Sequence, residues 1–149
     1  MNSRFACKCA AAILGACFLL LPVKGDDLRA ADKYEEMINC DLHSGSCIQP
    51  LGNHMLVLSV SPRPVKAMTD LMFEIVVKGD AKLTGLPFID LGMPGMDMGK
   101  NQVTLTKRGE GTYTGAGVIV RCKSGRRTWR ATVTVPGIGS AVFIFDVIY

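Results

Sequence analysis

The feature that most limits the fold is a strict alternation of side chains over residues 127–135 (RTWRATVTV). Every second residue is apolar from Trp129 onward, and the residues between are threonine or arginine. A repeat of two residues is the period of a β-strand with one buried and one exposed face. This segment therefore predicts a strand on a sheet surface, with Trp129, Ala131 and Val133 in the core.

Six further segments have strand-like composition and are separated by turn residues. In chain order the expected strands are 54–61, 71–78, 82–91, 102–107, 112–122, 127–135 and 141–148. Prolines between the first two exclude a central strand there. Seven short strands without a long amphipathic helix predict an all-β fold, a seven-stranded antiparallel immunoglobulin-like sandwich. We expect Phe143 and Phe145 in its core.

The first 25 residues predict a secretory signal peptide. Arg4 and Lys8 give a basic start, an apolar run of 14 residues follows over 10–23, and small side chains precede an expected cleavage before Asp26. The run is shorter than the roughly 20 apolar residues that a membrane span needs. We expect an exported, periplasmic protein with no stable membrane anchor after cleavage. The alternative is an uncleaved N-terminal anchor.

Cleavage would leave an arm and one domain. Residues 26–53 show little periodicity and predict an irregular arm, and residues 54–149 carry the β-sandwich. Fourteen basic residues would then face thirteen acidic ones, so the mature chain is close to neutral. Because there is no long basic stripe, we expect no binding to nucleic acid. We interpret a small basic spot at Arg126, Arg127 and Arg130 as a solvated face.

No catalytic constellation is recognisable in the sequence. The G-x-S-x-G, H-E-x-x-H, Walker and dinucleotide-binding patterns do not occur. Only two histidines, His43 and His54, are available for general base catalysis. We therefore expect a protein that is not an enzyme.

The segment most suggestive of binding is the methionine loop, residues 91–99 (LGMPGMDMG). It carries Met93, Met96 and Met98 among glycines and a proline, which form turns rather than core strands. Residues two apart in an extended chain face the same side, and a turn at Pro94 can bring Met93 back toward the other two. Three converging thioethers form a soft site that suits copper as Cu(I). The alternative is that the methionines cap an open end of the sandwich and bind no metal.

Two histidines and one cysteine are secondary ligand candidates. His54 opens the first expected strand beside Met55, and His43 lies in the arm. An imidazole from either can join a copper site. Cys122 ends an expected strand just before a turn. It can be a small buried hydrophobe, a ligand or the partner of another cysteine.

Three cysteines, Cys40, Cys47 and Cys122, remain after the expected cleavage. Disulfides persist in exported proteins, and the close spacing of Cys40 and Cys47 predicts a local disulfide in the arm. That bridge would leave Cys122 unpaired. The alternative interpretation is a metal site formed by Cys40, His43 and Cys47.

Residues 54–148 resemble the YtkA-like and FixH-like families of small exported or membrane-tethered β-sandwich domains. The resemblance rests on a Pro-Arg-Pro segment at 62–64, the loop MPGMDMGKNQ at 93–102, and glycines and a tyrosine over 109–115. It continues in the segment 125–131, which contains a tryptophan and an alanine. The methionine loop followed by an alternating strand is the most specific of these features.

The resemblance implies an immunoglobulin-like sandwich in the periplasm and assigns copper binding to Met93, Met96 and Met98. It also implies a partner among copper-handling or respiratory-oxidase assembly proteins. We therefore expect a periplasmic copper-binding carrier or chaperone-like protein. The second hypothesis is a metal-free interaction module whose methionine loop docks onto a partner.

Overall fold

The computed structural model describes residues 37–149, and within that range it contains nine strands and no helix. The strands are β1 (Cys47–Leu51), β2 (His54–Ser61), β3 (Asp70–Lys78), β4 (Phe88–Gly92), β5 (Gln102–Thr104), β6 (Thr106–Gly109), β7 (Thr112–Val118), β8 (Thr128–Val135) and β9 (Gly139–Asp146). The expected signal peptide (1–25) and the first part of the arm (26–36) lie outside the described residues. In the described part of the chain, no helix is long and apolar enough to cross a membrane.

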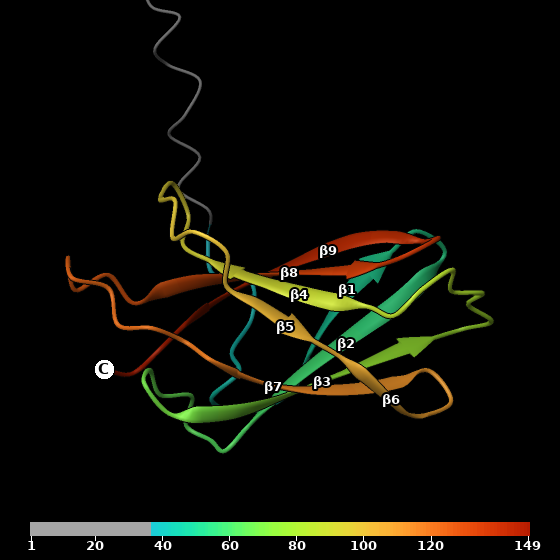
Figure 1. The fold of residues 1–149 in the computed structure, drawn as a ribbon, viewed down its shortest axis with the longest axis horizontal. Helices are drawn as coiled ribbons and strands as arrows, with labels where there is room; N and C mark the ends of the chain where they lie inside the picture. The colour runs from blue at the N-terminus through green and yellow to red at the C-terminus, as the bar shows by residue number, and fades with distance from the viewer. Residues whose placement is uncertain (1–36) are drawn as a thin grey trace, which may run out of the picture. The chain divides into compact units, whose positions relative to one another are not determined.

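The strands form two sheets that pack as layers (Figure 1). One sheet has the order β1-β2-β3-β7-β6 and the other has the order β5-β4-β8-β9. Every strand pair is antiparallel. The predicted all-β antiparallel sandwich is confirmed, with nine strands in place of the expected seven.

Two differences from the sequence-based expectation account for the strand count. Residues 47–51, expected in the irregular arm, form the edge strand β1, which pairs with β2 over its whole length. The expected strand 102–107 is divided at Leu105 into β5, which pairs with β4, and β6, which pairs with β7. The chain therefore changes sheet in the middle of one expected strand.

Two glycines of β7 make room for this change of sheet. On the core side of β7, Tyr113 is followed by Gly115 and Gly117. A Cβ atom at Gly117 would lie 2.5 Å from Cγ2 of Val103, and one at Gly115 would lie 3.0 Å from Cδ2 of Leu105. Glycine inside a strand often marks such a close approach of another segment. The side chains of Val103 and Leu105 fill the space that the two glycines leave.

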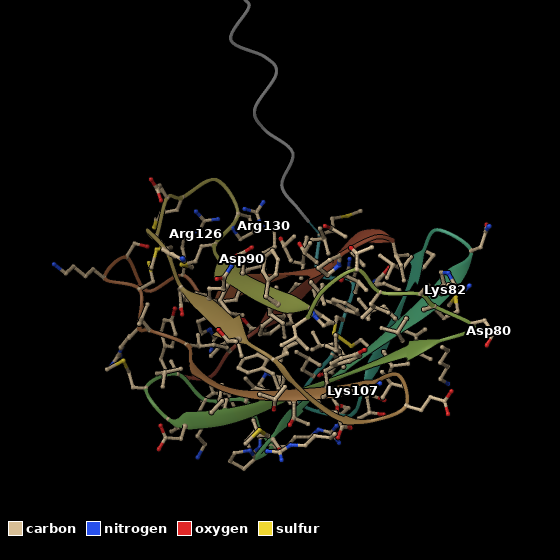
Figure 2. All side chains as sticks on the ribbon, turned by 45° about the vertical axis from the view of Figure 1, so that its right-hand side comes forward. Asp80, Lys82, Asp90, Lys107, Arg126 and Arg130 are labelled. Atoms are coloured by element: carbon tan, nitrogen blue, oxygen red, sulfur yellow. A yellow bond between two sulfur atoms is a disulfide. The ribbon has the colours of Figure 1, made fainter. Side chains whose placement is uncertain are left out.

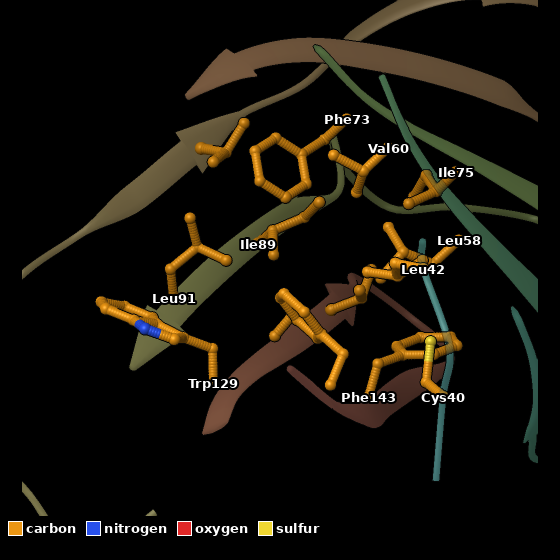
Figure 3. Packing of buried hydrophobic residues seen from close by; sticks show 14 of the residues in the cluster. Cys40, Leu42, Leu58, Val60, Phe73, Ile75, Ile89, Leu91, Trp129 and Phe143 are labelled. Carbon is orange, nitrogen blue, oxygen red and sulfur yellow. The ribbon is translucent and has the colours of Figure 1, made fainter. Parts of the chain in front are cut away.

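The hydrophobic core lies between the sheets (Figure 3). The five residues expected there are all fully buried: Trp129, Ala131, Val133, Phe143 and Phe145. Phe73 and Ile75 of β3 face Ile89 and Leu91 of β4 across the core, and all four are buried. The period of two in the sequence therefore identified the buried faces of β8 and β9 correctly.

The arm is held to the sandwich by a disulfide and by an asparagine. The predicted bridge between Cys40 and Cys47 is confirmed, with its Cα atoms 5.6 Å apart, so these sulfurs are not free for the alternative metal site. Leu42, inside the loop that the bridge closes, is fully buried. Asn39 donates its main-chain N–H to the carbonyl of Ile144 at 3.0 Å and accepts the Ile144 N–H on its side chain at 2.9 Å. These bonds cover part of the free edge of β9.

Candidate metal centre at the methionine loop

The methionine loop begins with the last two residues of β4, Leu91 and Gly92, and turns sharply at Pro94 and Gly95. Met93 and Met96 form an antiparallel bridge, and the Met96 N–H donates to the Met93 carbonyl at 3.2 Å. Gly95 has a φ of 66°, a left-handed value that glycine adopts without the steric cost of a Cβ atom. Proline before such a glycine is typical of a type II turn. Because antiparallel partners face the same side, this turn brings Met93 and Met96 to one face.

The three methionines of the loop differ in exposure. Met93 is fully buried in the core, whereas Met96 is 37% exposed and Met98 is half-buried. Met96 and Met98 line a hollow of about 330 Å³, to which Asp90 and Arg130 also contribute. The loop therefore offers thioether sulfur to solvent at Met96 and Met98, and Met93 belongs to the core beneath the sheet surface.

Cys122 lies against Met96, although 26 positions separate them in the chain. The Sγ atom of Cys122 is 3.9 Å from the Sδ atom of Met96 and 3.0 Å from the hydroxyl of Ser124. The hydrogen bond from Ser124 lowers the pKa of the Cys122 thiol, and the charge of Arg126 adds to this effect. Since the thiolate is the form that binds metal, a lowered pKa favours a ligand role.

The hydroxyl of Tyr149 fixes the segment that carries Cys122. It accepts a hydrogen bond from the Cys122 N–H at 3.2 Å and another from the indole N–H of Trp129 at 3.3 Å, and it donates to the carbonyl of Arg126. Two accepted bonds and one donated bond use the full capacity of a hydroxyl group. The guanidinium of Arg126 in turn donates to the carbonyl of Pro94 at 3.0 Å. The cysteine segment and the methionine loop are thus tied together.

The sulfur pair has the spacing expected of two ligands of one soft metal ion. Metal–sulfur bonds of about 2.3 Å, as in zinc thiolates, place two sulfurs about 3.8–4.0 Å apart at tetrahedral or trigonal angles. The observed separation between Cys122 and Met96 is 3.9 Å. Thiolate and thioether are both soft donors, which favour Cu(I) over harder cations. The residues present therefore fit a copper(I) ion.

The two histidines have other surroundings. His43 accepts a hydrogen bond on Nδ1 from the main-chain N–H of Val65 at 3.1 Å. His54 begins β2, and its buried Nδ1 has no hydrogen-bond partner among the described residues. The Nδ1 atom of His54 lies 2.9 Å from the position that a Cβ atom on Gly79 would take, just after the end of β3. That end of β3 is on the opposite side of Figure 1 from the methionine loop. Of the secondary candidates, the structure brings Cys122 to Met96.

Two residues that support the sulfur pair were not singled out from the sequence. Ser124 follows Cys122 by two positions, and a hydroxyl so close to a cysteine across a turn is a signal that could have identified it. Tyr149 is 27 positions from Cys122, and no local pattern connects the two. Its contribution emerges only from the packing of the chain end against the segment before β8.

Oxygen, nitrogen and thiolate ligands do not gather at another metal site in the described part of the chain. Among residues 37–149, no group of three or more His, Cys, Asp and Glu side chains is arranged to hold a metal ion. No protein-family model, curated protein or solved structure matches this chain. The resemblance to the YtkA-like and FixH-like families therefore stays a prediction, as do the ligands and partners that it implies.

Proposed function

We propose that this chain is a periplasmic copper-binding carrier or chaperone-like protein that holds Cu(I) at the methionine loop, with Cys122 as a further ligand. The observation that carries the proposal is the 3.9 Å separation between the sulfurs of Cys122 and Met96. The two donors come from separate segments, which a hydrogen bond from Arg126 ties together. The Cys40–Cys47 disulfide is compatible with an oxidising compartment such as the periplasm.

Exposure favours a carrier over a permanent structural metal. Structural metal sites are closed by protein ligands, whereas sites that exchange a ligand keep an open position. Met96 is 37% exposed, and with Met98 it lines a hollow that opens on the surface. Cys122 is buried, so a donor or acceptor protein would reach the copper from the side of Met96 and Met98. The partner we propose is a copper-handling or respiratory-oxidase assembly protein.

The direct test is Cu(I) binding by the purified protein without oxygen, in competition with a chromophoric Cu(I) chelator. We expect about one copper per chain. The double variant Met96→Leu with Met98→Leu, and separately Cys122→Ser, should weaken binding by more than the roughly 10–100-fold that losing an outer-shell partner costs. Leucine keeps the volume and apolarity of methionine, so folding should be little changed.

The matched control replaces two methionines outside the loop. Met55 on β2 and Met72 on β3 are each 43% exposed, so Met55→Leu with Met72→Leu removes the same number of thioethers from the surface. This variant should bind copper as the parent does. If the parent binds no copper, or if the loop variant binds as tightly as the control, the copper site is wrong. The metal-free interaction module would then be the better account of the exposed methionines.

A further inference from the structure

The segment that carries Cys122 is strongly basic. Five cations lie within residues 121–130, and no Asp or Glu occurs from residue 111 to residue 145. We call these five the basic collar: Arg121, Lys123, Arg126, Arg127 and Arg130. All except Arg130, which is half-buried, are exposed. The sequence alone suggested a solvated basic face here, but the structure places the collar beside the candidate copper site.

Two members of the collar contact the methionine loop or its hollow. Arg126 donates to the carbonyl of Pro94 at 3.0 Å. Arg130 lines the same hollow as Met96 and Met98. Figure 2 shows both arginines on one side of the domain, with Lys82 and Lys107 on the other. Positive charge therefore lies at the edge of the site on the side of sheet β5-β4-β8-β9.

Two further members flank the cysteine itself. Arg121 and Lys123 are its sequence neighbours and are both exposed. The guanidinium carbon of Arg121 lies 5.5 Å from the centroid of the Tyr149 ring, and the hydroxyl of that ring binds the Cys122 N–H. A guanidinium over a ring face is held in place by a cation–π interaction. The charge of Arg121 is thus fixed near the sulfur pair.

Carboxylates near the collar offset it only in part. Arg127 has an ion pair with Asp146 at 4.0 Å, but both side chains are well exposed, and such surface pairs are weak. Asp97 and Asp90, which line the hollow, accept hydrogen bonds from the Gly99 N–H and from the Gln102 side chain. The five cations thus outnumber the side-chain carboxylates of Asp90, Asp97 and Asp146, and the surface around the sulfur pair keeps an excess of positive charge.

Resting on the copper-binding function proposed above, we propose that the basic collar is the docking surface for an acidic patch of the protein that exchanges Cu(I) with this chain. Four of its five cations are arginines, whose planar guanidinium matches a carboxylate with two parallel hydrogen bonds. Opposite charges around the site would speed the encounter and orient the sulfur pair toward the donor. This attraction falls as salt rises, because the Debye length is about 8 Å at 0.15 M.

The first experiment measures docking without copper. A fluorescent oligoglutamate peptide serves as the acidic probe, and its binding to the metal-free protein is followed by anisotropy at low and physiological salt. We expect binding that weakens at least about tenfold as salt rises. Lys123→Glu with Arg127→Glu should abolish it. The control, Lys82→Glu with Lys107→Glu, makes the same change in net charge with exposed lysines at the other side of the domain and should bind as the parent does.

The second experiment measures copper transfer. Cu(I) is presented either as its anionic bicinchoninate complex or as its cationic neocuproine complex, and the transfer rate is recorded by stopped-flow absorbance. The anionic donor should transfer faster as salt is lowered, by about 10-fold or more, and the cationic donor should not. Only the collar variant should lose this difference, whereas the number of copper ions bound per chain at saturation should stay unchanged in both variants.

The outcomes separate this inference from the proposed function. If the parent binds no Cu(I) but binds oligoglutamate through the collar, the docking surface stands and the copper site fails. If the peptide binds the parent and the collar variant equally, or does not bind at all, the docking surface is wrong. Binding to vesicles of anionic phospholipid that the collar variant loses, without binding to the peptide, would overturn an acidic protein partner in favour of a membrane surface.

Discussion

Replacing Gly115 by alanine should destabilise this domain strongly, because the position has no room for a methyl group. Gly115 faces the core on β7, where the chain passes from β5 to β6. An added Cβ atom would lie 3.0 Å from a methyl group of Val103 and from one of Leu105, and closer still to the main-chain oxygen of Thr104. The side chains can rotate away. The carbonyl cannot move unless the whole crossing segment shifts.

The size of the effect follows from that obstacle. Inserting a methyl group into a packed core costs about 1–3 kcal/mol, and we expect the upper end because main chain is in the way. The entropy of unfolding is about 2.1 cal/mol/K per residue, so a domain of about 110 residues should lose about 13 °C in melting temperature for 3 kcal/mol. The loss should be visible in thermal unfolding followed by the fluorescence of Trp129, which is fully buried.

Gly109→Ala is the matched control, since Gly109 ends β6 in the same part of the chain. Its added Cβ atom would meet only the Thr112 side chain, at 4.0 Å, which is ordinary van der Waals contact. This variant should stay within about 0.5 kcal/mol of the parent. If Gly115→Ala and Gly109→Ala melt at the same temperature, residues 103–105 do not pack against β7 as described.

Three other outcomes are expected. Trp129→Ala should cost about 3–5 kcal/mol in urea unfolding, because a fully buried ring is lost; a smaller change than 1 kcal/mol would contradict its place in the core. In the urea-unfolded protein that begins at Asp26, Cys122 alone should react with iodoacetamide before reduction, and intact mass would show three adducts after it. The hydrogen bond from the Ser44 side chain holds the pKa of Asp41 below its ordinary value of 3.8. The ionised carboxylate of Asp41 therefore stabilises the fold at pH values above its ordinary pKa, and this stabilisation is lost as the pH falls through its lowered pKa. Asp41→Asn should accordingly destabilise the protein at neutral pH, and the difference from the parent should shrink as the pH falls through the lowered pKa of Asp41, which denaturant titrations at a series of pH values would measure.

The sequence predicted burial better than it predicted strand pairing. The alternation in β8 and β9 identifies the core face, since successive side chains of a strand point to opposite faces and the apolar set is the buried one. The alternation over residues 102–107 likewise puts Val103 and Leu105 on one face, and both are buried. The pattern of burial could not reveal that residues 102–107 pass from one sheet to the other, because the two sheets of a sandwich face the same core. A change of sheet therefore leaves the pattern of burial unbroken.

The edge strand β1 was missed for a different reason. Its sequence, CIQPL, contains Pro50, which argues against a central strand. At the edge of a sheet, however, a proline needs only to turn its missing N–H away from the neighbouring strand. The turn at Gly52, with a φ of 60°, then sets β1 antiparallel to β2. The sequence shows the proline, but it does not show that the proline lies at the edge of a sheet, where it is tolerated.

The candidate site, too, could be predicted only where it depends on neighbouring residues in the chain. The turn at Pro94 and Gly95 is local chemistry and could be predicted, but the approach of Cys122 to Met96 could not. It follows from one strand pairing, in which Gly92 at the end of β4 lies opposite Arg130 near the start of β8.

Antiparallel neighbours place the end of one strand beside the start of the other. The loop after β4 and the segment before β8 must therefore meet at one edge, whatever residues they carry. Once that pairing is known, the thioethers on the first segment, and the cysteine and basic collar on the second, become neighbours together. A substitution that weakened the pairing of β4 with β8 should accordingly disturb copper binding and acidic docking in parallel, whereas loss of Met96 and Met98 should disturb copper binding alone.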